Sequence, residues 1–431
     1  MSDLTAAAHP FLAELDWRGL LQDHSDGLGA RLSRGPLKAY VGFDPTAPSL
    51  HVGNLVPISD LVHLQRTGAG APVGLVGGGT GMIGDPSGKS AERNLLDEQT
   101  LDVNRAAIRL QLERFLDFSG SFAAQVMDNR EWLARYGLLE WLREIGKHFS
   151  VGYMLSKDSV QTRLAGGISF TEFSYMTLQA TDFLHLYRDH GVELQMGGAD
   201  QWGNITAGLE LIRRVVGRGE GDEPPAFALS SPLLLTSGGT KFGKTEQGTV
   251  WLAPEMTSPY VFYQYWIGQD DRDVVTMLRR LTLLAADDIR SIEEEQQRRP
   301  EARPAQRRLA LEMTARVHGP DEAERQVRVA EAAFSAEPLR DPDVLDVLFG
   351  ELDGFEFADE EQRGDALGLA VASGLFSSRS EARRQIAQGG FSINDQRVTE
   401  PDARIPDLIE GRYLVLRAGK KRLRVGRRRL G

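Results

Sequence analysis

Residues 40–54 read YVGFDPTAPSLHVGN, which is an apolar strand pattern, then a proline-broken turn, then a helix that begins near His51. In a doubly wound parallel sheet, ligands bind at the carboxyl ends of the strands, where helix N-termini present unpaired N–H groups and a positive dipole to anions. A histidine there can hydrogen-bond a phosphate, and a glycine such as Gly53 lets a flat base lie against bare backbone. By itself HVGN is a weak motif, because a surface histidine at a helix start is the commoner case.

Around this stretch, residues 37–236 alternate short apolar runs with longer segments of helical periodicity, as a doubly wound parallel sheet requires. We expect strands at residues 37–43, 72–77, 122–128, 192–197 and 227–235. We expect helices at residues 52–67, 101–118, 131–146, 170–189 and 201–216. The sequence therefore predicts an α/β fold, with a Rossmann-like doubly wound domain over residues 1–250.

The remainder of the chain has a different pattern. Charged amphipathic helices rich in Arg and Glu fill residues 258–352, so we expect an α-helical domain over residues 251–352. An acidic stretch, residues 353–363, is interpreted as a linker. Residues 364–431 predict a small α+β domain with strands near residues 391–393 and 413–416. From Gly411 onward there are nine Arg and Lys and no Asp or Glu, which indicates either a phosphate-binding surface or a solvated tail.

Composition limits the kinds of protein that this chain can be. At 431 residues it is longer than one core usually supports, so two or three domains are expected. The absence of cysteine excludes disulfide scaffolds, thiolate zinc sites and cysteine nucleophiles. A formal net charge of −11 argues against a protein that coats nucleic acid. With no signal-peptide pattern and no apolar run of about 20 residues, we expect a cytoplasmic protein without a membrane partner.

A second candidate for phosphate binding is GTKFGKTEQG, residues 239–248, which follows the last predicted strand. Lys241 and Lys244 stand three residues apart and are followed by the hydroxyl of Thr245. Such a set suits the β- and γ-phosphates of ATP in a loop that moves to admit it. This motif is also weak alone. Its position after the last strand, with a His-Gly helix start after the first, favours a nucleotide site.

The helix predicted at residues 170–189 places Tyr175, Gln179 and Asp182 at i, i+4 and i+7, on one face. Among apolar neighbours such a face indicates a pocket for a small zwitterion, and the alternative is a polar stripe that faces solvent. The next strand ends in GGADQWGN, residues 197–204, where Asp200 can accept hydrogen bonds from two ribose hydroxyls.

These residues resemble those of the class I aminoacyl-tRNA synthetases and, within that class, the bacterial tyrosyl enzymes. HVGN is similar to the HIGH signature of the class, and KFGKT to its KMSKS signature. Longer strings in the order typical of the tyrosyl family are YVGFDPTAPSLHVGN, LVGGGTGMIGDPSGK, ISFTEFSYMTLQATDFLHLY and LQMGGADQWGNI. Residues 377–398, SSRSEARRQIAQGGFSINDQRV, resemble the S4-type RNA-binding module that ends this family, so the resemblance extends over the whole chain.

The resemblance implies a role for each matching residue. Substrate tyrosine would be bound through its phenolic hydroxyl by Tyr40 and Asp182, through its α-ammonium group by Asp85, Tyr175 and Gln179, and near its carboxylate by Gln201. The triphosphate would be bound by Thr46, His51, Lys241, Lys244 and Thr245, and the rest of ATP by Asp44, Gly53, Asn54, Gly198 and Asp200. The implied catalytic set is Thr46, His51, Asn54, Lys241, Lys244 and Thr245. Asn54 replaces the second histidine of HIGH, and Phe242 and Gly243 replace Met and Ser of KMSKS.

The implied reaction has two steps. The carboxylate of L-tyrosine attacks the α-phosphate of Mg²⁺-bound ATP, and the resulting tyrosyl-adenylate passes its tyrosyl group to a terminal ribose hydroxyl of tRNA(Tyr). Because a carboxylate is ionised at pH 7, catalysis is expected from positioning and charge neutralisation, and no protein-bound metal site is predicted. The resemblance also implies a homodimer, with the region of Phe170 near its interface. Two alternatives are an HxGH-type nucleotidyltransferase for another small acid, and a catalytically inactive synthetase-derived RNA-binding protein.

Overall fold

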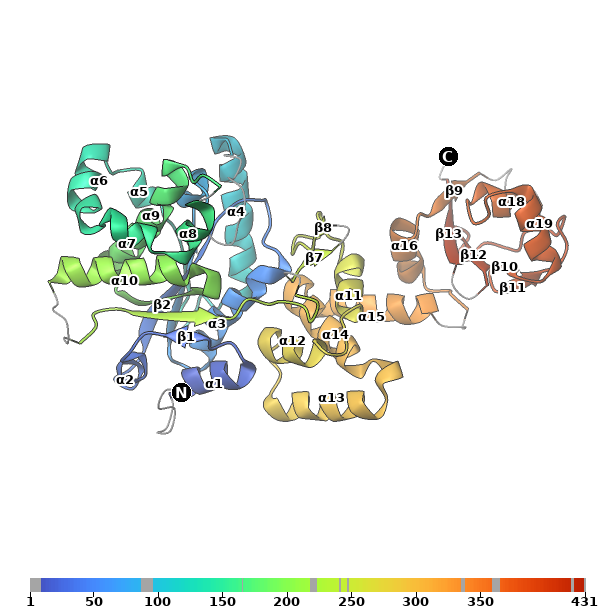
Figure 1. The fold of residues 1–431 in the computed structure, drawn as a ribbon. Helices are drawn as coiled ribbons and strands as arrows, with labels where there is room; N and C mark the ends of the chain where they lie inside the picture. The colour runs from blue at the N-terminus through green and yellow to red at the C-terminus, as the bar shows by residue number, and fades with distance from the viewer. Residues whose placement is uncertain are drawn as a thin grey trace. The chain divides into compact units, whose positions relative to one another are not determined.

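The computed structural model describes residues 9–86, 96–164, 166–217, 223–239, 242–245, 248–334, 338–358, 365–419 and 422–429. The chain divides into two compact units, Met1–Thr257 with Gly268–Leu309, and Ser258–Ile267 with Ala310–Gly431. Figure 1 labels the helices and strands of both units. Each unit has its own main sheet.

A six-stranded sheet with the order β1-β6-β5-β2-β3-β4 forms the centre of the first unit. Five strands run parallel, and β1 pairs antiparallel with β6 at one edge. The strands are β1 (Asp23–His24), β2 (Leu37–Phe43), β3 (Gly70–Val76), β4 (Gln125–Asp128), β5 (Val192–Gly198) and β6 (Phe227–Ser231). The chain builds the sheet from β2 out to β4 and then continues on the other side of β2, so the strand order switches direction between β2 and β5.

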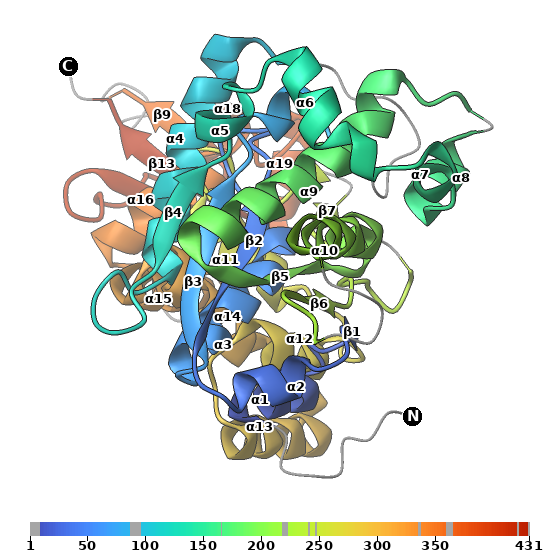
Figure 2. The same ribbon diagram turned by 90° about the vertical axis from the view of Figure 1, so that its left-hand side faces the viewer.

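Helices lie against this sheet. The crossovers from β2 to β3 and from β3 to β4 contain α3 (Leu55–Arg66) and α4 (Glu98–Phe115). Figure 2 shows α9 (Phe170–His190) and α10 (Trp202–Val216) over the face turned to the viewer. The remaining helices of this unit are α1 (Pro10–Arg18), α2 (Leu28–Leu32), η1 (Val52–Asn54), η2 (Thr80–Met82), α5 (Arg130–Leu133), α6 (Leu138–Glu144), η3 (Gly146–His148), α7 (Val151–Leu155), α8 (Asp158–Leu164), η4 (Ala199–Gln201), α12 (Val274–Leu281), α13 (Ala286–Arg298) and η5 (Pro300–Ala302). The central strands are largely buried, in agreement with their nearly continuous apolar sequences.

The α/β doubly wound fold class predicted from the sequence is confirmed by this sheet. β2 has the predicted bounds, whereas the strand predicted at residues 227–235 ends at Ser231, because Pro232 lacks the N–H that a ladder requires. The helix predicted at residues 131–146 is two helices, α5 and α6. The edge strand β1 was not predicted, since two residues are too few to show a period.

The second unit contains a five-stranded sheet with the order β11-β10-β12-β13-β9. Its strands are β9 (Phe355–Phe357), β10 (Phe391–Ile393), β11 (Gln396–Val398), β12 (Tyr413–Ala418) and β13 (Arg422–Arg428). Its helices are α11 (Pro259–Ile267), α15 (Pro320–Phe334), α16 (Pro342–Glu351), α18 (Ala366–Ala372) and α19 (Arg379–Ala387), while α14 (Pro304–His318) crosses the division between the units. β9 lies within the segment interpreted as a linker and pairs in parallel with β13, and β12 and β13 contain the described part of the basic C-terminal sequence.

The described residues contain neither a candidate membrane span nor a cluster of metal ligands. No helix there is long and apolar enough to cross a membrane. No group of three or more His, Asp or Glu side chains in the same ranges is arranged to hold a metal ion.

Candidate active site

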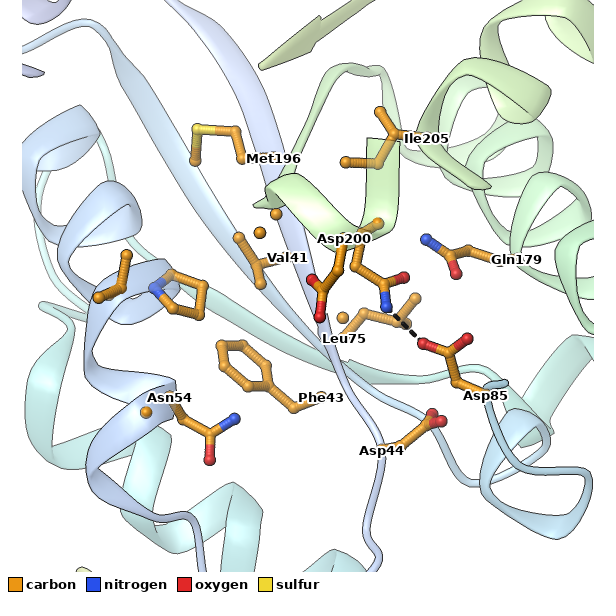
Figure 3. Close-up of a pocket in the computed structure, with 18 of the residues that line it drawn as sticks. Val41, Phe43, Asp44, Asn54, Leu75, Asp85, Gln179, Met196, Asp200 and Ile205 are labelled. Carbon is orange, nitrogen blue, oxygen red and sulfur yellow. Dashed lines mark hydrogen bonds between the residues drawn. The ribbon is translucent and has the colours of Figure 1, made fainter. Parts of the chain in front are cut away.

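A cavity of about 520 Å³ opens at the carboxyl ends of β2 and β5, where the strand order switches direction. Figure 3 shows Asn54 on one side of this cavity, Gln179 and Asp85 on the other, and Asp200 between them. The predicted site residues that line it are Tyr40, Asp44, Thr46, His51, Gly53, Asn54, Asp85, Tyr175, Gln179, Asp182, Gly198, Asp200 and Gln201. The fold therefore gathers residues from four separate stretches of the sequence into one cavity.

Two of the lining side chains, Tyr40 on β2 and Asp182 on α9, are 1% and 2% exposed. The Tyr40 hydroxyl has no hydrogen-bond partner among the described residues. Burial raises the pKa of Tyr40 well above its usual value, and the charge of Asp182 raises it further, which indicates that the two groups are close. A buried hydroxyl without a partner is costly, so this pair fits a ligand that supplies its own hydrogen-bonding group.

Two N–H donors hold the Asp182 carboxyl in place. Asn129 Nδ2 donates to Oδ2 at 2.8 Å, and Trp132 Nε1 donates to Oδ1 at 2.7 Å. Burial raises the pKa of Asp182 to about 8, although both hydrogen bonds act in the opposite direction. Asp182 is thus fixed in orientation by two donors.

A chain of hydrogen bonds connects Asp182 to the carboxyl end of β2. Asn129 Nδ2 also donates to the Thr80 hydroxyl at 2.9 Å, and that hydroxyl donates to Asp44 Oδ1 at 2.8 Å. The Tyr175 hydroxyl donates to the other Asp44 oxygen at 2.8 Å. Burial and the charges of nearby carboxylates raise the pKa of Tyr175 well above its usual value, so its hydroxyl remains a donor.

Another part of the cavity wall, which includes Asp85, Gln179 and Gln201, is an amide and carboxylate network. The Gln201 amide donates to Asp85, a contact drawn as the dashed line in Figure 3. Asn204 Nδ2 donates to the amide oxygens of Gln179 at 3.0 Å and of Gln201 at 3.2 Å. These contacts orient the side chains that were predicted to hold the ends of a zwitterion.

His51 and Asn54 cap the short helix η1, which leads directly into α3. His51 Nδ1 accepts from Gly53 N at 3.0 Å, and His51 N donates to Asn54 Oδ1 at 3.0 Å. This reciprocal arrangement is a capping box. Because Nδ1 accepts, the proton of a neutral His51 ring belongs on Nε2, and because Oδ1 of Asn54 is used, its NH₂ group remains as a donor.

Residues 32–335 match the family of tRNA synthetases class I (W and Y), and residues 347–425 match the tyrosine–tRNA ligase SYY-like C-terminal domain. The chain is 51% identical over 409 residues to the tyrosine–tRNA ligase of Anaeromyxobacter dehalogenans strain 2CP-1, covering 94% of this chain and 96% of that relative. This chain belongs to the tyrosine–tRNA ligase family. It is 46% identical over 421 residues to the tyrosine–tRNA ligase of Bacillus caldotenax, covering 95% and 98% of the two chains.

A solved structure supports the same assignment. The C-terminally truncated mitochondrial tyrosyl-tRNA synthetase of Coccidioides posadasii has a TM-score of 0.65 and 32% identity, over 74% of this chain and 91% of that one. The predicted enzyme class and the predicted activity, ligation of tyrosine to its tRNA, are confirmed by family membership over nearly the full length. Neither alternative, a nucleotidyltransferase for another acid or an inactive RNA-binding protein, is retained.

The described residues include only part of the Lys-rich loop, which is defined here as residues 236–249. Lys241 lies outside them, and Lys244 and Thr245 form β7 (Lys244–Thr245), which pairs with β8 (Gly248–Thr249). Gly243 lines the cavity with a φ of +81°, and a Cβ added to it would stand 2.5 Å from Cγ2 of Val52. A glycine at this position of the signature therefore lets the loop lie against η1.

Sequence reasoning missed two residues that line the cavity, Asn129 and Gln195, and two that donate hydrogen bonds to lining residues, Asn204 and Trp132. Asn129 directly follows the predicted strand at residues 122–128, so the rule that identified Asp200 at a strand end would also have found it. Asn204 lies within the GGADQWGN string but was given no role. Gln195 and Trp132 gave no signal, since one lies inside a strand and the other in a short helix, and Gln195 Oε1 is buried with no partner in the described ranges.

Proposed function

We propose that this cavity is where the enzyme forms tyrosyl-adenylate, and that Tyr40 and Asp182 recognise the phenolic hydroxyl of tyrosine. The observation that carries the proposal is the buried Tyr40 hydroxyl, which has no partner among the described residues and lies near Asp182. The substrate hydroxyl would accept from Tyr40 and donate to Asp182. A site that pairs a hydroxyl rejects the analogue without it, because buried groups are then left unpaired, and tyrosyl enzymes against phenylalanine are the established example.

The zwitterionic end of tyrosine would meet Asp85, Tyr175 and Gln179. Asp85 is 7% exposed and faces the cavity, so its carboxylate suits the α-ammonium group, together with Tyr175 and Gln179. Gln201, which donates to Asp85, would lie near the substrate carboxylate. Asp44, for which we also propose ATP binding, accepts from Tyr175 and Thr80 through its two oxygens and so holds Tyr175 in place.

ATP would bind at the start of η1 and at the end of β5. The adenosine would contact Gly53, Asn54, Gly198 and Asp200, which all line the cavity. The triphosphate would be bound by Thr46, His51, Lys241, Lys244 and Thr245. His51 would donate through Nε2, in agreement with the acceptor role of its Nδ1.

The first chemical step would be an in-line attack of the tyrosine carboxylate on the α-phosphate, with pyrophosphate as the leaving group. The carboxylate is already a nucleophile, so the protein has to align the two substrates and neutralise the charge that develops on pyrophosphate. His51 and the two lysines would supply that neutralisation. Mg²⁺ would enter with ATP on the phosphate oxygens that it prefers.

In the second step, a terminal ribose hydroxyl of tRNA(Tyr) would take the tyrosyl group from the adenylate. We propose a division of labour along the chain: residues 1–250 for catalysis, residues 251–352 for the anticodon side of the tRNA, and residues 364–431 for an S4-like RNA-binding domain. The arginine-rich strand β13 suits phosphate contacts. Because ATP and tRNA are its substrates, we place the enzyme in the cytoplasm.

Replacement of Lys244 by Ala tests the nucleotide half of the proposal. In tyrosine-dependent ATP–pyrophosphate exchange, we expect Lys244→Ala to lower kcat by about 100-fold, because one donor to the developing charge is lost. The control is Arg290→Ala on α13, which removes an exposed cation outside the cavity. If Lys244→Ala catalyses exchange at the parent rate, Lys244 in the Lys-rich loop does not stabilise the triphosphate.

We also propose that the enzyme is a homodimer. Large apolar side chains are exposed between α6 and the start of α9, with Leu138 at 73%, Leu139 at 82%, Val151 at 64% and Phe170 at 79%. Exposed apolar side chains in such number are typical of protein–protein interfaces. They lie in the region where the family resemblance places the dimer contact.

A charge at this surface is expected to oppose the dimer. Phe170→Lys should shift the molar mass measured by light scattering from two chains toward one at micromolar concentration, because burying an unpaired ammonium is costly. Val103→Lys, which places a lysine at the 62% exposed Val103 of α4, is the control. A single-chain mass for the parent enzyme would contradict the proposed dimer.

A further inference from the structure

Asp60 is a buried carboxyl group to which the proposed reaction gives no role. It lies in α3 with none of its surface exposed, and the equally buried Ser231 hydroxyl donates to its Oδ2 at 2.7 Å. Asp60 Oδ1 has no hydrogen-bond partner in the part of the chain that the structure describes. Burial raises the pKa of Asp60 well above its usual value, and the hydrogen bond from Ser231 acts in the opposite direction. A buried polar atom without a partner still costs stability, and its presence requires an explanation.

Ser231 is the residue at which β6 ends and the chain approaches the Lys-rich loop. It pairs with Gly198 of β5, which lines the cavity. Three residues later, the Leu234 carbonyl accepts a hydrogen bond from Phe242 N at 3.0 Å. Leu234 and Phe242 also line the cavity. A shift of the strand end would therefore move the base of the Lys-rich loop.

The other end of the loop is tied to the same helical segment. The Val250 carbonyl accepts from Val52 N of η1 at 3.1 Å, and Leu252 N donates to the Leu50 carbonyl at 2.9 Å. After the loop, backbone hydrogen bonds therefore connect the chain to the HVGN segment. Before the loop, the side-chain hydrogen bond of Ser231 connects the chain to α3, the helix that follows HVGN.

We propose that Asp60 is a positioning residue: through Ser231 it fixes the entry of the Lys-rich loop to the helix that carries HVGN, and so keeps the two halves of the triphosphate site in register. This inference rests on the roles proposed for His51 and Lys244. An apolar pair of similar volume would fill the same space without a buried carboxyl, often with equal or greater stability. What it would lose is the directional contact, because apolar packing tolerates sliding that a hydrogen bond at 2.7 Å does not.

The test compares three variants of the full-length enzyme in ATP–pyrophosphate exchange, with active sites counted by the burst of adenylate formation. For Asp60→Leu combined with Ser231→Ala, we expect kcat/KM for ATP to fall by about tenfold or more while KM for tyrosine stays unchanged. Its melting temperature should be no lower than that of the parent. Asp60→Asn keeps a side-chain oxygen that accepts from Ser231, so it should remain within about twofold of the parent. Ser59→Ala is the matched control, because the buried Ser59 hydroxyl donates to the Leu55 carbonyl of its own helix.

A parental kcat/KM for ATP in the double variant would overturn the proposal, as would an equal loss in Ser59→Ala. If the double variant does not fold, Ser231→Ala alone decides between the same outcomes, since it removes only one hydroxyl. The Lys244→Ala variant distinguishes a failure of the proposed triphosphate site from a failure of the positioning role. Parental exchange by Lys244→Ala means that the proposed triphosphate site is wrong, whereas loss of exchange there with parental Asp60 and Ser231 variants means that only the positioning role is wrong.

Discussion

At the scale of single residues, Asp182 combines two opposing influences. Burial disfavours its charged form, and the N–H groups of Asn129 and Trp132 favour it, with burial the larger effect. The carboxyl therefore keeps a proton in the folded enzyme at pH values where the unfolded chain has lost it. An incoming phenol that donates a hydrogen bond would shift this balance toward the carboxylate.

The raised pKa of Asp182 predicts how stability changes with pH. Its pKa is about 8 in the folded state against an ordinary value of 3.8, so its contribution to stability is fully present below pH 4 and is lost as the pH rises toward 8. Asp182→Asn lacks this titration. We expect the free energy of unfolding of the variant, relative to that of the parent, to rise between pH 5 and pH 8 without substrates, by up to about 1.4 kcal/mol per pH unit, as measured by denaturant unfolding at each pH. A constant difference would show that the folded pKa is not raised.

At the scale of elements, sequence periodicity located the strands and helices that are long enough to show a period. β2 was predicted with its observed bounds, whereas β1 and β9, of two and three residues, are too short to show a period and depend on pairing with partners distant in the chain. The same distinction applies to the site. Tyr175 and Asp182 share a helical face that spacing predicts, but the contact of Asp182 with Trp132 depends on how α5 packs against α9.

Two residues that depart from the class signatures, Asn54 and Gly243, each make a specific contact in the structure. Asn54 completes a capping box with His51, and Gly243 adopts a left-handed conformation against Val52. Neither contact can be read from the motif, because each depends on the backbone geometry at the site. The resemblance identified the two positions, and the structure shows what surrounds the residues at them.

At the scale of the whole molecule, the two proposed steps place different demands on the two units. Amino-acid activation needs only the cavity of the first unit, whereas transfer needs tRNA bound by the chain. The second unit carries exposed arginines on α19, at Arg379, Arg383 and Arg384. A net charge of −11 makes such local clusters necessary for binding a polyanion.

This separation predicts a variant that affects only one step. Arg383→Glu combined with Arg384→Glu should raise KM for tRNA by about tenfold. The slope of log affinity for tRNA against log salt concentration should become less steep by roughly 1 to 2. Pyrophosphate exchange should stay at the parent rate, because no tRNA takes part in it. Unchanged aminoacylation across a salt series would show that α19 does not contact tRNA phosphates.

The central claim is that the buried Tyr40 hydroxyl and Asp182 select tyrosine by pairing its phenolic hydroxyl. The most direct test is the ratio of kcat/KM for tyrosine to that for phenylalanine, measured by pyrophosphate exchange in the parent enzyme and in Tyr40→Phe. We predict that the ratio falls by about tenfold in the variant, chiefly through poorer use of tyrosine, because one hydrogen bond to the substrate is lost. An unchanged ratio, in a variant that still folds and binds ATP, would contradict the claim.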